Sequence, residues 1–252
     1  MIYCTVIPTY NNARTVADIV RRTKAVCGGV IVVNDGSTDN TLRELQPFGN
    51  AITLISYSRN RGKGYALHRG MEAARKAGYD YAVTIDSDGQ HSPEEIPSLV
   101  NALPTDDAPR PTLIVGSRWQ DVGNADNLPQ GMPAGNTFAN RFSNFWFRVQ
   151  TGISLPDTQT GFRVYPLHHL PCLSLLTYRY ESELELLVFS AWRGVNIKPV
   201  PVSVSYPDDR VSHFRPFRDF FRISLLNTIL CLLAIVYGYP RLLLTKLITH
   251  NS

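Results

Sequence analysis

Short apolar runs alternate with helical patterns through the first half of this 252-residue sequence, and this alternation narrows the choice of fold. The runs are rich in β-branched residues and end in turn residues, which is typical of buried strands; they cover residues 2–7, 30–33, 52–57, 81–85 and 113–115. Apolar residues at helical spacing lie between them, at residues 15–25, 38–45, 64–77 and 93–103. The repeat predicts an α/β fold with a mostly parallel central sheet and flanking helices.

The second half of the sequence is less regular and ends in an apolar stretch. It predicts a loop leading into a helix at residues 125–148, a helix at 179–194, a strand at 196–205 and a basic loop at 207–218. Residues 223–239 are apolar and uncharged, a little short of the ~20 residues of a membrane span. Because arginines flank this stretch, we expect residues 219–252 to form a helical tail that lies on or re-enters a membrane. A core helix and a complete span are the alternatives.

The charge and the cysteine content indicate which partners and which cellular compartment to expect. The net charge of +4 and the pI of about 8.9 suit anionic partners such as phosphates or a membrane surface, and they give no reason to expect nucleic acid. The four cysteines are widely spaced and form no zinc or disulfide pattern, which favours a reducing compartment. The sequence enters an apolar run at once, so we expect no signal peptide and place the protein at the cytoplasmic face of a membrane.

Two aspartates, Asp86 and Asp88, follow the apolar run at residues 81–85. Alternation along a strand would point both carboxylates the same way, at the sheet edge where open α/β sheets bind ligands. Two like charges held close repel each other unless a cation lies between them. Oxygen ligands suit Mg²⁺ and Mn²⁺, which proteins often hold together with phosphates. The pair therefore predicts a divalent metal beside a diphosphate, although a solvated loop would carry the same residues.

Four segments at predicted strand ends carry a resemblance to a known family: residues 6–12, 31–41, 60–64 and 86–91. In this order they resemble the nucleotide-sugar-binding half of a family 2 glycosyltransferase of the GT-A type, close to polyprenyl-phosphate (dolichyl-phosphate) mannose or glucose synthases. The resemblance continues through residues 116–118, 157–163, 180–181 and 210–215. It implies a GT-A catalytic domain at residues 1–218, ahead of the tail.

The resemblance implies roles for the residues on the donor side. Asp86 would contact the nucleotide sugar, and Asp88 with Gln90 would bind Mg²⁺ or Mn²⁺. Asp35 would accept hydrogen bonds from the base; a turn role is the alternative, and both roles can hold together. Lys63, between two glycines, would reach ribose or phosphate or remain a solvated loop residue. Pro8 and Tyr10 are the remaining expected contacts to the nucleotide, together with Asn12. Asn12 stands where the family usually has a glutamate.

Several arginines are candidate phosphate ligands, because guanidinium groups match phosphate oxygens at two points. They are Arg118, Arg163, Arg210 and Arg215. Arg163 is also a candidate for a structural ion pair with Asp157 or Glu181. Ser212 and His213 lie in a loop that we expect to close over the diphosphate.

The acceptor decides which chemistry the site needs. A lipid phosphate is already an anionic nucleophile, whereas a hydroxyl acceptor needs a base, for which Asp157 or Glu181 are candidates. The resemblance implies an inverting displacement that moves a hexose from a GDP-mannose or UDP-glucose type of donor to polyprenyl phosphate. The alternatives are a family 2 enzyme acting on a hydroxyl of another lipid or glycan, and a non-catalytic nucleotide-sugar or lipid-binding module. The sequence leaves the donor sugar and the oligomeric state open.

Overall fold

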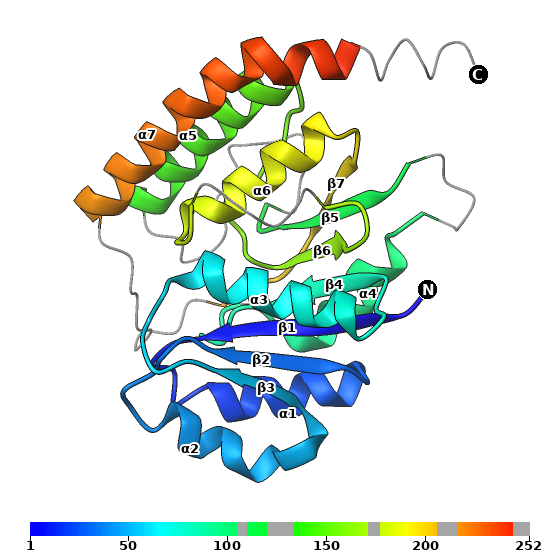
Figure 1. Ribbon diagram of the computed structural model, residues 1–252, viewed down its shortest axis with the longest axis vertical. Helices are drawn as coiled ribbons and strands as arrows, with labels where there is room; N and C mark the ends of the chain where they lie inside the picture. Colours follow the sequence, from blue (N-terminus) through cyan, green and yellow to red (C-terminus); the bar gives the residue numbers. More distant parts are fainter. Residues whose placement is uncertain (105–109, 120–133, 171–176, 206–215, 244–252) are drawn as a thin grey trace.

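The computed structural model describes residues 1–104, 110–119, 134–170, 177–205 and 216–243. A seven-stranded sheet with helices on both faces forms its centre (Figure 1). In the order in which they lie, the strands are β3 (Thr53–Ser56), β2 (Val30–Asn34), β1 (Tyr3–Thr9), β4 (Tyr81–Thr84), β6 (Arg163–Pro166), β5 (Thr112–Ser117) and β7 (Asn196–Pro201). The predicted α/β class with a mostly parallel sheet is confirmed.

The helices of the described residues follow the predicted alternation in the first half of the chain. They are α1 (Val16–Val26), α2 (Thr41–Leu45), α3 (Lys63–Lys76), α4 (Ile96–Asn101), α5 (Ala134–Thr151), α6 (Glu181–Trp192) and α7 (Pro216–Leu233). Three further helices among the described residues continue or precede them: the 3₁₀ helices η1 (Gln46–Ala51) and η2 (Pro93–Glu95), and the π-helix η3 (Ala234–Gly238).

Strand β1 runs further than the sequence predicts, through Pro8 to Thr9. The amide of Thr5 and the carbonyl of Thr9 both bond towards the β2 side, so the backbone of Pro8 faces the β4 side. Pairing of β1 with β4 ends at Val6. The missing amide hydrogen of Pro8 therefore falls where no ladder bond is needed, and the proline is tolerated at the strand's end.

Strand β6 was not predicted. It lies between β4 and β5 and is antiparallel to both. Its four residues are all buried, and they include an arginine and a proline, so neither alternation nor a long apolar run marks the segment. This strand brings the loop before it, residues 157–162, to the edge of the sheet beside Asp86.

Helix α7 packs onto the rest of the protein through one face. Leu226, Leu230 and Ala234 are buried in the same hydrophobic core as Trp192 of α6. In Figure 1, α7 lies alongside α5, on the same side of the sheet as α6. The helix that runs from Phe221 to Leu243 is the one described helix long and apolar enough to cross a membrane, and 28% of its most apolar stretch is buried in the protein. The predicted boundary at residue 218 falls inside α7.

Candidate active site

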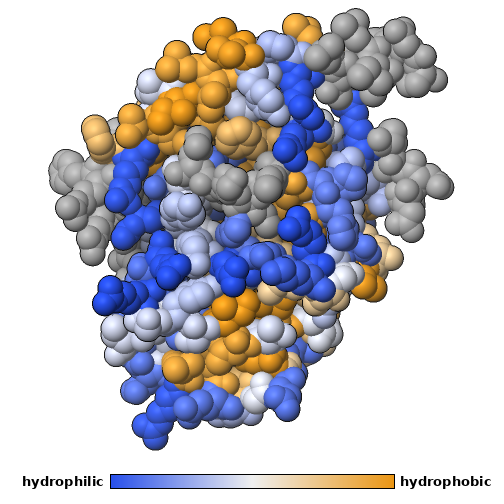
Figure 2. All heavy atoms as spheres, viewed as in Figure 1, coloured by the Kyte–Doolittle hydropathy of each residue, from blue (hydrophilic) through white to orange (hydrophobic). Residues whose placement is uncertain are grey.

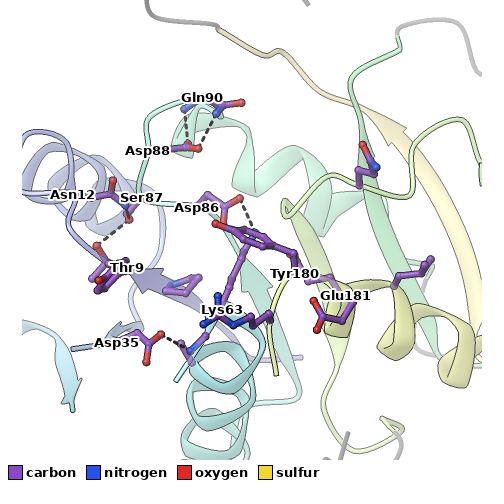
Figure 3. A pocket seen from close by; sticks show the side chains of 18 of the residues that line it. Thr9, Asn12, Asp35, Lys63, Asp86, Ser87, Asp88, Gln90, Tyr180 and Glu181 are labelled. Atoms are coloured by element: carbon purple, nitrogen blue, oxygen red, sulfur yellow. Dashed lines mark hydrogen bonds and ion pairs between the residues drawn. The ribbon is translucent and has the colours of Figure 1, made fainter. Parts of the chain in front are cut away.

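A cavity of about 870 Å³ lies where β1, β2 and β4 end, and α5 and α6 form its opposite wall. The carboxyl ends of parallel strands are the usual ligand-binding edge of an open α/β sheet. Ten residues that the sequence singles out line this cavity: Pro8, Tyr10, Asn12, Asp35, Lys63, Asp86, Asp88, Gln90, Arg118 and Glu181. Figure 3 shows how most of the polar ones converge from separate elements.

Lys63 forms the centre of an ion cluster in this cavity. Its Nζ lies 2.8 and 2.9 Å from the two carboxylate oxygens of Asp86 and 2.9 Å from Oε2 of Glu183. Burial lowers the pKa of Lys63, but the charges of Asp86 and Glu183 outweigh burial and raise it overall. Burial likewise raises the pKa of Asp86, and the charge of Lys63 brings it below its ordinary value. Lys63 and Asp86 are therefore both charged at neutral pH.

Gly161 makes room for this cluster. A Cβ atom at this position would come within 2.7 Å of Oδ2 of Asp86 and 2.8 Å of Nζ of Lys63. The sequence analysis missed Glu183, whose partner Lys63 is distant in the chain. The feature that points to Glu183 is the run Glu181, Glu183 and Glu185 on a helix whose residues are nearly all buried. Buried carboxylates need partners, so such a run indicates an ion pair or a site.

Asp88 and Gln90 form the outer part of the acidic corner. Oδ1 of Asp88 accepts the amide of Gln90 at 3.0 Å, and Oδ2 accepts the side-chain Nε2 of Gln90 at 2.8 Å. Burial raises the pKa of Asp88, and repulsion from Asp86 raises it further. A divalent cation would relieve this repulsion, and carboxylate and amide oxygens are ligands that Mg²⁺ and Mn²⁺ accept. The donor set therefore fits the predicted metal, provided that the Gln90 amide turns to present its oxygen. The described residues contain no cluster of three or more His, Cys, Asp or Glu side chains placed to hold a metal.

Asp35 holds the loop that precedes Lys63. Its two carboxylate oxygens accept the backbone amides of Arg61 and Gly62, each at 2.8 Å. Gly62 has a φ of 105°, which few other residues adopt, so the turn depends on it. Burial raises the pKa of Asp35, and the two amides oppose that shift. A contact from Asp35 to a nucleotide base stays a prediction, and such a contact would share these occupied oxygens.

Asn12 joins two of the loops that line the cavity. Its side-chain Nδ2 donates to Oγ of Ser87 at 2.7 Å, and Ser87 donates to Oγ1 of Thr9 at 3.0 Å. The loop after β1 is thereby tied to the residue between Asp86 and Asp88. Asparagine can make this bond because it carries donor hydrogens, which an ionised glutamate in the same place lacks.

Arg118 enters the cavity wall as half of an ion pair with Asp157. Its Nε and Nη2 donate to the two carboxylate oxygens of Asp157 at 2.6 and 2.9 Å. Asp157 is fully buried, and it also accepts Nδ2 of Asn140 at 2.6 Å. Burial raises the pKa of Asp157, but the charge of Arg118 outweighs it and lowers the pKa. Asp157 does not line the cavity, so the structure does not present it to an acceptor as a base; it orients Arg118.

Arg163 is fully buried and does not line the cavity. Its guanidinium donates to the carbonyls of Thr158, Thr160 and Glu183, each at 2.8 Å, and to the Tyr165 hydroxyl at 3.1 Å. The predicted alternative, an ion pair with Asp157 or Glu181, is not formed. Arg163 instead ties residues 158–160 to the first turn of α6, and the structure gives its predicted phosphate contact no support.

The other predicted residues divide into those that face the cavity and those outside the described residues. Glu181 faces the cavity; it is buried, and its Oε2 makes no hydrogen bond. Arg179, which the sequence analysis did not single out, also lines the cavity. Four predicted ligands lie outside the described residues: Arg210, Ser212, His213 and Arg215.

Several known proteins are similar to this chain in sequence. It is 28% identical over 244 residues to the UDP-N-acetylglucosamine–dolichyl-phosphate N-acetylglucosaminyltransferase of Methanococcus voltae, a match covering 88% of this chain and 94% of the relative. It is 29% identical over 202 residues to the polyprenol monophosphomannose synthase of Mycolicibacterium smegmatis (76% and 71% covered). To the undecaprenyl-phosphate mannosyltransferase of Micrococcus luteus it is 27% identical over 209 residues (79% and 82% covered).

Solved structures agree on the fold. The glucosyl-3-phosphoglycerate synthase of Mycobacterium tuberculosis, crystallised with Mn²⁺, uridine diphosphate and phosphoglyceric acid, superposes with a TM-score of 0.62. Its sequence is 21% identical, and the match covers 92% of this chain and 78% of that structure. The predicted GT-A type of fold is thus confirmed. The sequence profile of the family described as glycosyl transferase family 2 matches residues 4–168. This chain is therefore a member of glycosyl transferase family 2.

Proposed function

We propose that this protein transfers a hexose from a nucleotide-diphosphate sugar to a polyprenyl phosphate at the cytoplasmic face of a membrane. One observation carries the proposal: a single cavity joins the acidic corner at Asp86 and Asp88 to Ala139 of α5 and Ile223 of α7. A charged donor and a lipid-linked acceptor would both need such a cavity. The names of the three relatives, which all act on polyprenyl or dolichyl phosphates, support the choice of acceptor.

The acidic corner would hold the donor. Asp88 and Gln90, with Asp86, would bind Mg²⁺ or Mn²⁺, which supplies positive charge to the departing diphosphate. Lys63 already lies against Asp86, so it is placed to contact a donor phosphate or ribose. Pro8 and Tyr10, at the end of β1, would pack on the nucleoside.

The acceptor phosphate would attack without a base. A phosphate monoester is largely ionised at neutral pH, so positioning and charge neutralisation supply the catalysis. Arg118, which Asp157 orients, faces the cavity and can bind a phosphate oxygen. Attack from the face opposite the diphosphate would invert the anomeric carbon and give a β-linked product from an α-linked donor.

A hydroxyl acceptor is the second candidate, and Glu181 favours it. This buried carboxylate lines the cavity and has an oxygen without a hydrogen bond, so it could accept a proton from an attacking hydroxyl. The variant Glu181→Gln separates the two reactions. A phosphate acceptor should tolerate it within about tenfold in kcat, whereas loss of a general base typically costs ~10²-fold or more.

The test is a transfer assay with the full chain in detergent. Labelled UDP-glucose, UDP-N-acetylglucosamine and GDP-mannose are each incubated with Mn²⁺ and undecaprenyl phosphate, with Asp88→Asn as the matched control. We expect labelled lipid from at least one donor, and a large loss of it in the variant. Donor binding without product from any sugar would instead support a binding module, and it would overturn the proposal.

A further inference from the structure

Helices α5 and α7 expose an apolar surface on one side of the molecule. Six of its large side chains are each more than half exposed, and we call them the apolar platform: Phe138 and Phe145 on α5, Phe221, Leu225 and Leu232 on α7, and Val236 on η3. Figure 2 shows hydrophobic residues gathered at the end of the molecule where these helices lie side by side. Exposed apolar patches of this kind usually mark a contact with a partner or a membrane.

The opposite face of α7 is fixed to the protein, so the helix is not a free anchor. Asn227 is 2% exposed, and its Oδ1 accepts Nε2 of the buried Gln150 of α5 at 3.0 Å. Trp192 donates its Nε1 to the carbonyl of Gln150 at 2.8 Å, and its ring lies so close to Gly238 that a Cβ there would be 2.5 Å away. These contacts hold α7 beside α5, with the platform facing outwards.

Arginines border the platform on both helices. The helical repeat places Arg141 and Arg148 along the edge of the stripe that Phe138 and Phe145 form. Arg222 and Arg241 add positive charge on the other helix. Cationic side chains at the border of an apolar face complement anionic lipid headgroups.

The two helices also decide how the platform can meet a bilayer. If α7 stood across the membrane, α5 beside it would carry Arg141 and Arg148 into the hydrocarbon, where each arginine is costly. If both helices lie flat, the apolar side chains enter the acyl boundary and the arginines stay among the headgroups. The cavity reaches Ile223 and Ala139 of the same helices, so a flat orientation also brings its wall to the level of the headgroups.

We infer that the platform docks flat on an anionic phospholipid bilayer, with α5 and α7 parallel to the membrane plane and neither helix crossing it. The inference deepens the proposed function by naming the surface that meets the lipid. Its test is a binding measurement that needs no turnover, so transfer and docking can fail separately.

Docking is measured by flotation of the full chain with liposomes of phosphatidylcholine and phosphatidylglycerol. Phe145→Glu and Leu232→Glu should each lower the bound fraction about tenfold or more, because each puts a charge where an exposed apolar side chain would enter the bilayer. Leu54→Glu on the distant β3, where the leucine is 38% exposed, is the matched control and should float as the wild type does. A thermal melt with nucleotide sugar shows that each variant is folded. The inference would be overturned if the platform variants floated as the wild type does. This includes the case in which they lose self-association but still bind the liposomes.

Orientation is measured separately, with tryptophan placed at three exposed positions along α7 and its continuation. Phe221→Trp, Leu232→Trp and Leu243→Trp lie about 16 Å apart along a helix axis. If the helix lies flat, a lipid brominated at a given depth should quench the fluorescence of the three added tryptophans to the same extent. Quenching at position 232 by deeply brominated lipid, with shallow quenching at 221 and 243, would show a span and contradict the flat orientation.

Discussion

Removing the positive charge of Lys63 should destabilise the folded protein, and the loss should depend on pH. Lys63→Met leaves Asp86 and Glu183 facing each other without a cation. Breaking a buried ion pair by removing one partner typically costs about 3–5 kcal/mol. The side chains of Lys63 and Asp86 are 18% and 27% exposed to solvent. Solvent screening therefore reduces the expected loss of folding stability to about 2–3 kcal/mol.

The sign of the pH dependence follows from the carboxylates. In the wild type the pKa of Asp86 is lowered, so its contribution to stability is present at neutral pH and is lost as pH falls through that lowered value. In the variant, burial and repulsion from Glu183 should raise the pKa of Asp86 above its value in the unfolded chain. The folded variant would then take up a proton as pH falls. The gap between wild type and variant should therefore be widest near pH 8 and should shrink towards pH 5.

Urea unfolding at pH 8 and pH 5 measures this gap, with Lys76→Met as the matched control. Lys76 pairs with Glu72 at 2.9 Å, but its side chain is 71% exposed, so its loss should cost well under about 1 kcal/mol at either pH. If Lys63→Met costs no more than the control, or the same at both pH values, then the cluster does not stabilise the fold as we argue.

Three further predictions concern the residues around this cluster. Asp88→Asn should raise the stability of the metal-free protein at pH 7 by up to about 1 kcal/mol, because it removes repulsion from Asp86, while abolishing the Mn²⁺-dependent part of the donor's thermal shift; a lower melting point in EDTA would contradict this. Arg163→Met should cost about 3 kcal/mol or more in urea unfolding, since three buried carbonyls lose their donor; a loss in donor affinity at unchanged stability would instead indicate a ligand role. Gly161→Ala should disrupt the cluster and weaken donor binding at least tenfold by calorimetry, since its Cβ would lie 2.7 Å from Asp86; unchanged affinity would show that the cluster is not part of the donor site.

The strands that carry the donor side were predictable because each is a run of apolar residues that ends in a polar turn. Asp35, Lys63 and Asp86 come from three separate segments, yet parallel strands bring their ends to one edge. The same reasoning failed for β6, a four-residue strand that begins with Arg163 and ends with Pro166. Its neighbours, β4 and β5, supply apolar contacts that the sequence of β6 itself does not indicate.

The partners of charged residues were harder to predict. Arg163 stands in a family motif and suggested a phosphate ligand, but only the tertiary structure reveals three carbonyls around its guanidinium. Glu183 pairs with Lys63 across 120 positions of sequence, and no local pattern links them. Composition indicated an apolar tail, but it could not tell which face of α7 is buried on Trp192 and which is exposed.

We propose that sugar passes from the donor to a lipid phosphate in this cavity. The most direct measurement compares undecaprenyl phosphate with undecaprenol, which has the same tail and a hydroxyl in place of the phosphate, under single-turnover conditions with Mn²⁺ and the donor that gives product. We predict labelled lipid from the phosphate alone, with the β-anomer as product. Equal or greater transfer to undecaprenol, or hydrolysis of the donor with neither lipid labelled, would contradict the claim.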